Sequence, residues 1–354
     1  MTTGRTREER LERALTLART GRAAEKRRDL AGALDRYSAA RDALEGVGPT
    51  ALEANVLRWS GSVLRDLGDI EGADVLYADS VSVADRINDT AAKASGLNCR
   101  AVIAQRRGHI EDAIELYRGA KMLAAEAGEI RLYGMIEQNL GVLANIRGDL
   151  PRASSHYHAA LDAFEEVADD EAASWVLNNL GMLYTDLGQP RQAESFIGRG
   201  LAIVLARGDR PMQGILRTNL GEALLAQERW EAAERELSEA LELAREGQDR
   251  AREGEALRYI GVLHAQKGQE ELALANLSEA LKIGSFLDDF LLVSEVLTDR
   301  GAIHRDGGRI EEAVADWSRA AAGFTTLGAS RDADRVASLL DALPGPAGLR
   351  ESPS

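Results

Sequence analysis

Side-chain amides recur at one position of this sequence, and their chemistry is that of peptide recognition. Asn139, Asn179 and Asn219 each precede a Leu-Gly pair, and they lie forty residues apart. A carboxamide carries both a donor and an acceptor, so it can pair with a peptide N–H and C=O together. Packed helices lie about 8–10 Å apart and an extended peptide rises about 3.3 Å per residue. One amide per repeat would therefore hold roughly every third residue of a bound peptide.

The spacing of forty residues runs through most of the chain. Stepping by forty gives a column of small residues: Gly21, Gly61, Ala101, Gly141, Gly181, Gly221, Gly261 and Gly301. A second column is always alanine, from Ala33 to Ala313, and a third is bulky: Tyr37, Tyr77, Tyr117, Tyr157, Ile197, Leu237, Leu277 and Trp317. Eight repeats without an insertion predict stacked units of one supersecondary structure.

Each repeat has the pattern of two helices joined by a tight turn. In one repeat the helices are expected at about residues 91–107 and 111–126. The turn glycines suit a left-handed helix end, and they recur as Gly68, Gly108, Gly148, Gly188, Gly268 and Gly308. Acidic residues between the repeats are predicted to cap the next helix or to lie in its first turn, namely Asp89, Glu129, Asp169, Asp209, Asp249 and Asp289.

The composition narrows the class of protein. The 354 residues are 45% hydrophobic and only 5% aromatic, with seven prolines, which favours long helices over sheets. A net charge of −15 argues against direct binding of nucleic acid. The single cysteine, Cys99, rules out an intrachain disulfide and a cysteine-based zinc site. The charged N-terminus and the lack of a long apolar run predict a cytoplasmic protein without a membrane segment.

These columns resemble the tetratricopeptide repeat family. Gly61, Gly68, Ala73, Tyr77 and Ser80 stand at the spacing of that family's motif. The resemblance covers residues 8–327, although the period is forty and not the usual thirty-four. The longer period is similar to kinesin-light-chain repeats and to the sensor regions of bacterial, especially actinobacterial, transcription activators.

The resemblance implies an all-α, right-handed superhelical solenoid. About eight helix-turn-helix repeats are expected over residues 1–327, a capping helix over residues 328–343 and a disordered tail over residues 344–354. Such a family member is a non-catalytic protein without a cofactor or metal.

In that family the first helices line a concave groove. We call the residue three places before the small-residue column "column A" and the residue two places before it "column B". Column A is Arg58, Asn98, Gln138, Asn178, Thr218, Arg258 and Thr298, and column B is Trp59, Cys99, Asn139, Asn179, Asn219, Tyr259 and Asp299. The peptide-binding groove is expected to contain the amides Asn98, Gln138, Asn139, Asn145, Asn178, Asn179 and Asn219, the aromatic anchors Trp59, Trp175 and Tyr259, and the cations Arg58, Arg65, Arg106 and Arg258. Arg305 is a further candidate cation, and Glu222, Asp186, Asp299 and Asp306 would oppose binding of acidic groups nearby.

Structural roles compete with these assignments. An asparagine before Leu-Gly can serve only to bond the neighbouring helix and fix the register of the repeats. His264 and His304 are expected at helix interfaces, and His156 and His158 lack a third metal ligand. Cys99 is either a small neutral residue or a modifiable thiol. Trp230 and Trp317 are expected to be structural.

The sequence thus predicts a scaffold that holds an extended segment of a protein or peptide in its groove. The alternative is a regulatory or sensory protein that controls a separate transcription factor or enzyme in a bacterial pathway. Direct binding of nucleic acid or membranes is not expected, and self-association remains open.

Overall fold

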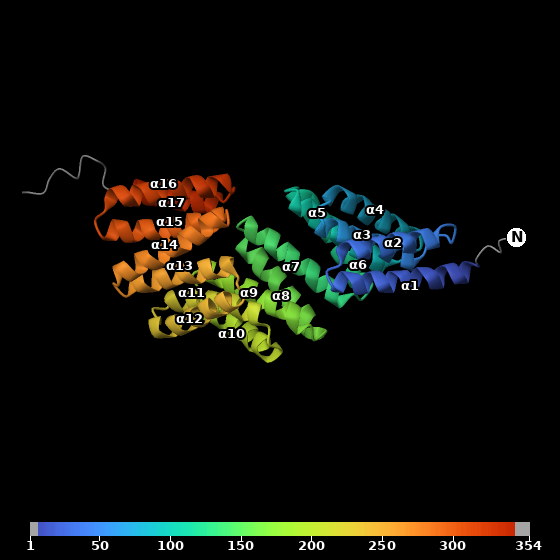
Figure 1. The fold of residues 1–354 in the computed structure, drawn as a ribbon, viewed down its shortest axis with the longest axis horizontal. Helices are drawn as coiled ribbons and strands as arrows, with labels where there is room; N and C mark the ends of the chain where they lie inside the picture. The colour runs from blue at the N-terminus through green and yellow to red at the C-terminus, as the bar shows by residue number, and fades with distance from the viewer. Residues whose placement is uncertain (1–5, 344–354) are drawn as a thin grey trace, which may run out of the picture. The chain divides into compact units, whose positions relative to one another are not determined.

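The computed structural model describes residues 6–343, and these residues form seventeen α-helices and no strand (Figure 1). The predicted all-α fold is confirmed. Within the described residues, no helix is both long and apolar enough to cross a membrane. The expected tail at residues 344–354 lies outside the described residues.

Every repeat contributes a first and a second helix. The first helices are α1 (Arg7–Lys26), α3 (Ala51–Asp66), α5 (Thr90–Arg106), α7 (Ile130–Ile146), α9 (Asp170–Asp186), α11 (Arg210–Leu225), α13 (Arg250–Gln266) and α15 (Phe290–Asp306). The second helices are α2 (Leu30–Leu44), α4 (Ile70–Arg86), α6 (Ile110–Glu126), α8 (Leu150–Glu166), α10 (Pro190–Arg207), α12 (Trp230–Glu246), α14 (Glu270–Phe286) and α16 (Ile310–Thr326). A last helix, α17 (Ser330–Asp341), follows.

The chain consists of two compact units. Unit 1 comprises residues 1–176, unit 2 comprises residues 177–354, and the boundary falls inside α9. In unit 1 the first helices of successive repeats contact one another, α1 with α3 and α3 with α5; in unit 2, α11 contacts α13 and α13 contacts α15. Successive second helices of the described chain make no comparable contact. The first helices therefore form the inner face of each unit, and columns A and B are borne by these helices.

The turns follow the sequence pattern. The six predicted turn glycines all have positive φ, from 67° at Gly188 to 91° at Gly68. The Asp89 carboxylate accepts a hydrogen bond from the Ala92 backbone N–H at 2.9 Å and so caps α5. Asp209, Asp249 and Asp289 cap α11, α13 and α15 in the same way. Glu129 makes no such bond, in keeping with the preference for the shorter acid at this position.

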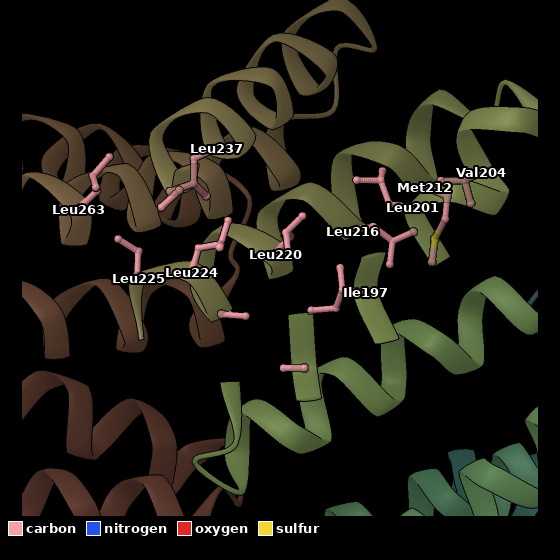
Figure 2. Packing of buried hydrophobic residues seen from close by; sticks show 13 residues of the cluster. Ile197, Leu201, Val204, Met212, Leu216, Leu220, Leu224, Leu225, Leu237 and Leu263 are labelled. Carbon is pink, nitrogen blue, oxygen red and sulfur yellow. The ribbon is translucent and has the colours of Figure 1, made fainter. Parts of the chain in front are cut away.

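The glycine column sets how closely the two helices of a repeat approach. A Cβ atom placed on Gly141 would lie 2.6 Å from the Tyr157 ring, and one placed on Gly301 would lie 2.5 Å from the Trp317 ring. Both rings are almost fully buried. Figure 2 shows the corresponding packing in unit 2, where Leu237 of α12 lies in a cluster with residues of α10, α11 and α13. At these positions only glycine leaves room for the bulky partner, although Ala101 takes the glycine's place in the repeat of α5 and α6.

The last helix covers the apolar side of the last repeat. Val336 of α17 is fully buried in a cluster with Trp317 and Phe324 of α16. The Trp317 indole N–H also donates to the Thr298 backbone oxygen at 2.9 Å. The end of the stack is therefore closed by a helix whose other faces are polar, as a repeat array requires.

We predict that Gly301→Ala destabilises the protein by about 1–3 kcal/mol, because the added methyl group overlaps the rigid, buried Trp317 ring. Gly198→Ala is the matched control, since a Cβ atom at this helical glycine of α10 meets nothing within 4 Å. It should stabilise by up to about 1 kcal/mol through helix propensity. Urea unfolding of the two variants measures both effects. Equal effects would refute the role given to the glycine column.

Candidate functional site

Columns A and B contact each other across neighbouring repeats. In unit 2 the Asn219 amide N–H of α11 donates to the Asn178 side-chain oxygen of α9 at 2.7 Å. Two repeats further along, Arg258 Nε of α13 donates to Asp299 Oδ2 of α15 at 2.6 Å. In both pairs a column A residue meets the column B residue forty-one positions later. These bonds tie adjacent first helices together, and we call each such pair a rung.

The equivalent rung in unit 1 is open. Asn98 is only 6% exposed, yet its side-chain oxygen has no hydrogen-bond partner. Asn139, the residue forty-one positions later, makes no side-chain hydrogen bond in the described part of the chain, and neither does Gln138. The buried side-chain oxygen of Asn145, two turns beyond Gln138 on the same face of α7, also lacks a partner. Unit 1 thus holds two unsatisfied amide oxygens among the predicted groove residues.

Cationic and aromatic side chains of the inner face of unit 1 lie together. The Arg58 guanidinium carbon is 5.9 Å from the centroid of the Trp59 ring, and that of Arg22 is 5.3 Å from it. Arg58 Nη2 donates to the Asn55 side-chain oxygen at 3.1 Å. Among the described residues Arg58 forms no ion pair with a carboxylate. An Arg stacked on an aromatic ring without a counter-ion is suited to an acidic group of a partner.

The remaining predicted residues of unit 1 differ in availability. Arg65 is paired with Asp66 at 2.8 Å, Arg106 is exposed, and Trp175 is 44% exposed on α9. Burial raises the pKa of the Cys99 thiol, although Arg58 and Arg65 act in the opposite direction. The thiol is therefore neutral, which favours the interpretation of Cys99 as a small packing residue.

The inner face of unit 2 carries a network centred on Arg258. Its side chain is 15% exposed, and Nη1 donates to Glu295 Oε2 at 2.7 Å in addition to the bond with Asp299. Burial alone would lower the pKa of Arg258, but Asp299 and Glu295 outweigh it and raise the pKa. The guanidinium also lies 4.8 Å from the centroid of the Tyr259 ring. Arg258 is thus held by internal partners, and its predicted contact with a ligand stays a prediction.

Carboxylates outnumber cations in this network. Burial raises the pKa of Glu295 to about 7; Arg258 opposes this shift, whereas Asp299, Glu222 and Glu255 reinforce it. Burial also raises the pKa of Glu222, which accepts a hydrogen bond from Tyr259. Glu295 and Glu255 were not among the residues predicted for the groove. Their position is that of Trp175, three residues before column A, so the forty-residue register contained the signal.

The other predicted amide of unit 2, Asn179, makes no side-chain hydrogen bond within the described residues. Asn178 also donates to the Met182 sulfur at 3.5 Å. Asn178 and Asn219 therefore form the bond between neighbouring helices that was the structural alternative to a ligand role. Whether they also contact a partner stays a prediction.

Histidines occupy helix interfaces. His304 Nδ1 accepts from Arg309 Nε at 2.9 Å, and His264 Nδ1 lies 2.6 Å from the Gln269 side-chain oxygen. His156 Nδ1 lies 2.5 Å from Glu137 Oε2. Within residues 6–343, no group of three or more His, Cys, Asp or Glu side chains is placed to hold a metal ion.

We predict that the Asn178–Asn219 rung contributes about 1 kcal/mol to the free energy of unfolding. In a double-mutant cycle, Asn178→Ala and Asn219→Ala should each destabilise the protein, and the double variant should lose less than their sum. Urea unfolding gives the coupling energy. Strictly additive effects would show that the hydrogen bond does not stabilise the fold.

We predict that Glu295 makes the fold less stable as pH rises. Its folded pKa of about 7 exceeds the ordinary 4.5, so the folded state binds the extra proton between these values, and stability falls as pH rises through this window. Glu295→Gln should remove about 2 kcal/mol of this pH dependence, a figure reduced for the partial exposure of the side chain. Unfolding at pH 5 and pH 8 measures it, with the exposed Glu242→Gln as the control. An unchanged difference between the two pH values would contradict the assignment.

Comparison with known proteins supports the resemblance seen in the columns. Residues 132–206 and 213–284 match the family model described as tetratricopeptide repeat. The resemblance to that family is confirmed for these segments, which include most of the central repeats. No curated protein matches the chain in sequence.

Solved structures of this class share the fold. A tetratricopeptide repeat protein from Parabacteroides merdae has a TM-score of 0.56 at 17% identity, covering 80% of this chain and 98% of that chain. The apo quorum sensor NprR from B. thuringiensis gives 0.60 at 13% identity, covering 94% and 97%. A Rap protein complexed with Competence and Sporulation Factor gives 0.57 at 12% identity, covering 93% and 97%. At these identities the similarity concerns the fold.

Proposed function

We propose that this chain, whose central repeats match the tetratricopeptide repeat family, is a non-catalytic scaffold that binds an extended segment of a partner protein or peptide. The binding surface is the inner face of unit 1, with Asn98, Gln138, Asn139 and Asn145 as its polar groups. The observation that carries the proposal is the open rung: Asn98 keeps a buried oxygen without a donor, whereas Asn178 at the equivalent position is bonded to Asn219.

The energetics favour an external donor at Asn98. A buried carbonyl oxygen without a hydrogen bond costs about 1–3 kcal/mol. A peptide N–H would recover that cost when the Asn98 side chain rotates toward the groove, because the oxygen itself is buried. Asn139 and Gln138, which are only partly buried and bond to nothing within the described chain, supply further donors and acceptors. A backbone recognised in this way contributes affinity with little dependence on the ligand's side chains.

Side-chain preference comes from the neighbouring cation. Arg58 is stacked on Trp59 and has no carboxylate partner among the described residues. A partner segment with an aspartate or glutamate near the residue that contacts Asn98 would complete this charge. We therefore expect an acidic residue to be the main side-chain preference of the site.

The second candidate function is regulatory. Proteins described as a quorum sensor and as a Rap protein complexed with Competence and Sporulation Factor share the fold over more than nine tenths of this chain. On this alternative, occupancy of the inner face by a peptide changes the binding of a separate transcription factor or enzyme. Co-purification of such a protein, with an affinity that changes when peptide is added, favours this function over a simple scaffold.

The proposed binding can be tested with a randomised twelve-residue peptide display library selected on the full chain. We expect enrichment of sequences with aspartate or glutamate, and loss of their binding by about tenfold or more in Asn98→Leu and Arg58→Gln. Asn98→Leu should leave the free energy of unfolding unchanged or raise it, because it removes an unsatisfied buried oxygen.

Asn219→Ala is the matched control for this experiment. It should lower stability and leave the selected peptides bound, because Asn219 serves a rung closed inside the chain. If Asn98→Leu destabilises the fold and leaves binding intact, Asn98 is structural and the proposal for unit 1 is wrong.

A further inference from the structure

A cleft of about 370 Å³ lies in unit 1 between the second helices α6 and α8, above α7. Leu140 and Ala144 of α7 contribute apolar lining. The inner face is formed by the first helices, so a cleft between second helices opens on the outer side of the unit. Its charged and titratable lining residues are Arg118, Lys121, Arg147, Asp149, Arg152 and His156.

The previous repeat contains an equivalent cleft, about 490 Å³ in volume, which shows what this position of the fold normally holds. There Asp74 of α4 pairs with Arg100 Nε at 3.2 Å and with Arg107 Nη1 at 2.9 Å. Asp112 and Glu115 also line that cleft. Its two arginines thus face three carboxylates, and their charge is neutralised within the chain.

In the cleft between α6 and α8, none of the three acidic residues of the previous cleft has an acidic equivalent. Ile114 takes the position of Asp74, Arg152 that of Asp112 and Ser155 that of Glu115. Four cationic side chains now line the cleft against the single carboxylate of Asp149. That carboxylate caps α8 and pairs with Arg152 Nη1 at 3.1 Å. In a chain with 58 acidic and 43 basic residues, composition does not account for such a gathering of cations.

Two more carboxylates, those of Glu137 and Glu111, pair with these side chains from outside the cleft lining. Glu137, only 2% exposed, lies beside the cleft and bonds Lys121 Nζ at 3.1 Å and His156 Nδ1 at 2.5 Å. Burial would raise the pKa of Glu137, but hydrogen bonds from His156, Tyr133 and Lys121 outweigh it and lower the pKa. The ionised Glu137 therefore holds Lys121 and His156 in place at the cleft.

The arginines have weaker partners. Arg147 is paired with Glu111, whose side chain is 82% exposed, so solvent and salt screen that pair. Arg118 forms no ion pair with any described residue. The guanidinium groups of Arg118, Arg147 and Arg152 thus lack a buried counter-ion.

We propose that this outer cleft binds a phosphate monoester. A guanidinium group binds two oxygens of a phosphate with a pair of N–H donors. Three guanidinium groups at one cleft supply more donors than a single carboxylate can accept, which favours phosphate as the ligand. Lys121 and the Ser155 hydroxyl add donors from α6 and α8. The volume of the cleft suits one small phosphorylated group. None of its lining residues belongs to column A or column B, so the site is independent of the proposed peptide binding.

Isothermal titration calorimetry of the full chain tests the site with O-phospho-L-serine and inorganic phosphate as probes, and with L-serine as the control that lacks the phosphate group. At constant ionic strength we expect saturable binding of phosphoserine, none of serine, and a loss of affinity of about tenfold or more in Arg118→Gln/Arg152→Gln. Stronger binding of a phosphoserine-containing peptide than of phosphoserine would identify a phosphorylated partner as the source. Equal or weaker binding would identify a small phosphorylated molecule.

Ile114→Asp is the sharper variant. It introduces the acid that stands at the equivalent position of the neighbouring cleft, where Asp74 is accommodated by the same fold. It should abolish phosphate binding without altering the helical circular dichroism spectrum. Absence of saturable binding by the unaltered chain, or binding that survives both variants, would overturn the proposal. Peptide selection on the inner face of unit 1 should be unaffected, which separates failure of this site from failure of the proposed function.

Discussion

The fold depends on one contact repeated every forty residues, in which a small residue of the first helix meets a bulky side chain of the second; the small residue is glycine in seven repeats and Ala101 in the other. Gly141 against Tyr157 and Gly301 against Trp317 leave no room for even a methyl group. This contact sets the separation of the two helices, and its recurrence gives the repeats nearly the same geometry. Because the geometry repeats, residues forty positions apart occupy equivalent places, and the chain can vary their chemistry without altering its backbone.

Equivalent positions then acquire different roles. The rung between columns A and B joins Asn178 with Asn219 and Arg258 with Asp299, and both pairs satisfy their polar groups inside the chain. At the same place in unit 1, Asn98 keeps an unsatisfied oxygen. A closed rung ties neighbouring first helices together, whereas the open rung is the group that we propose to bind another molecule. Under the proposed function, the same residue type serves structure in one repeat and recognition in another.

The sequence was sufficient to predict the features that recur with the forty-residue repeat. Helix boundaries near residues 90 and 126, the positive φ of the turn glycines and the aspartate caps all follow from local residue types at fixed spacing. The partner of Asn178 was not predicted, although the register contained it, because the diagonal contact of forty-one residues depends on how adjacent first helices are offset. Which amide stays unsatisfied depends on side-chain rotamers, which no pattern of residue types encodes.

Charged residues in an otherwise apolar column are the clearest departure from the repeat. One position in the first helices is leucine in six repeats, including Leu97 and Leu177, but it is Glu137 and Arg217 in the other two. Arg217, 13% exposed, pairs with Glu239 at 2.7 Å and also with Glu236. Replacing such paired charges with leucine is often neutral or stabilising, because desolvation offsets the attraction. Stability alone therefore does not account for Glu137, whereas its placement of Lys121 and His156 at the outer cleft does.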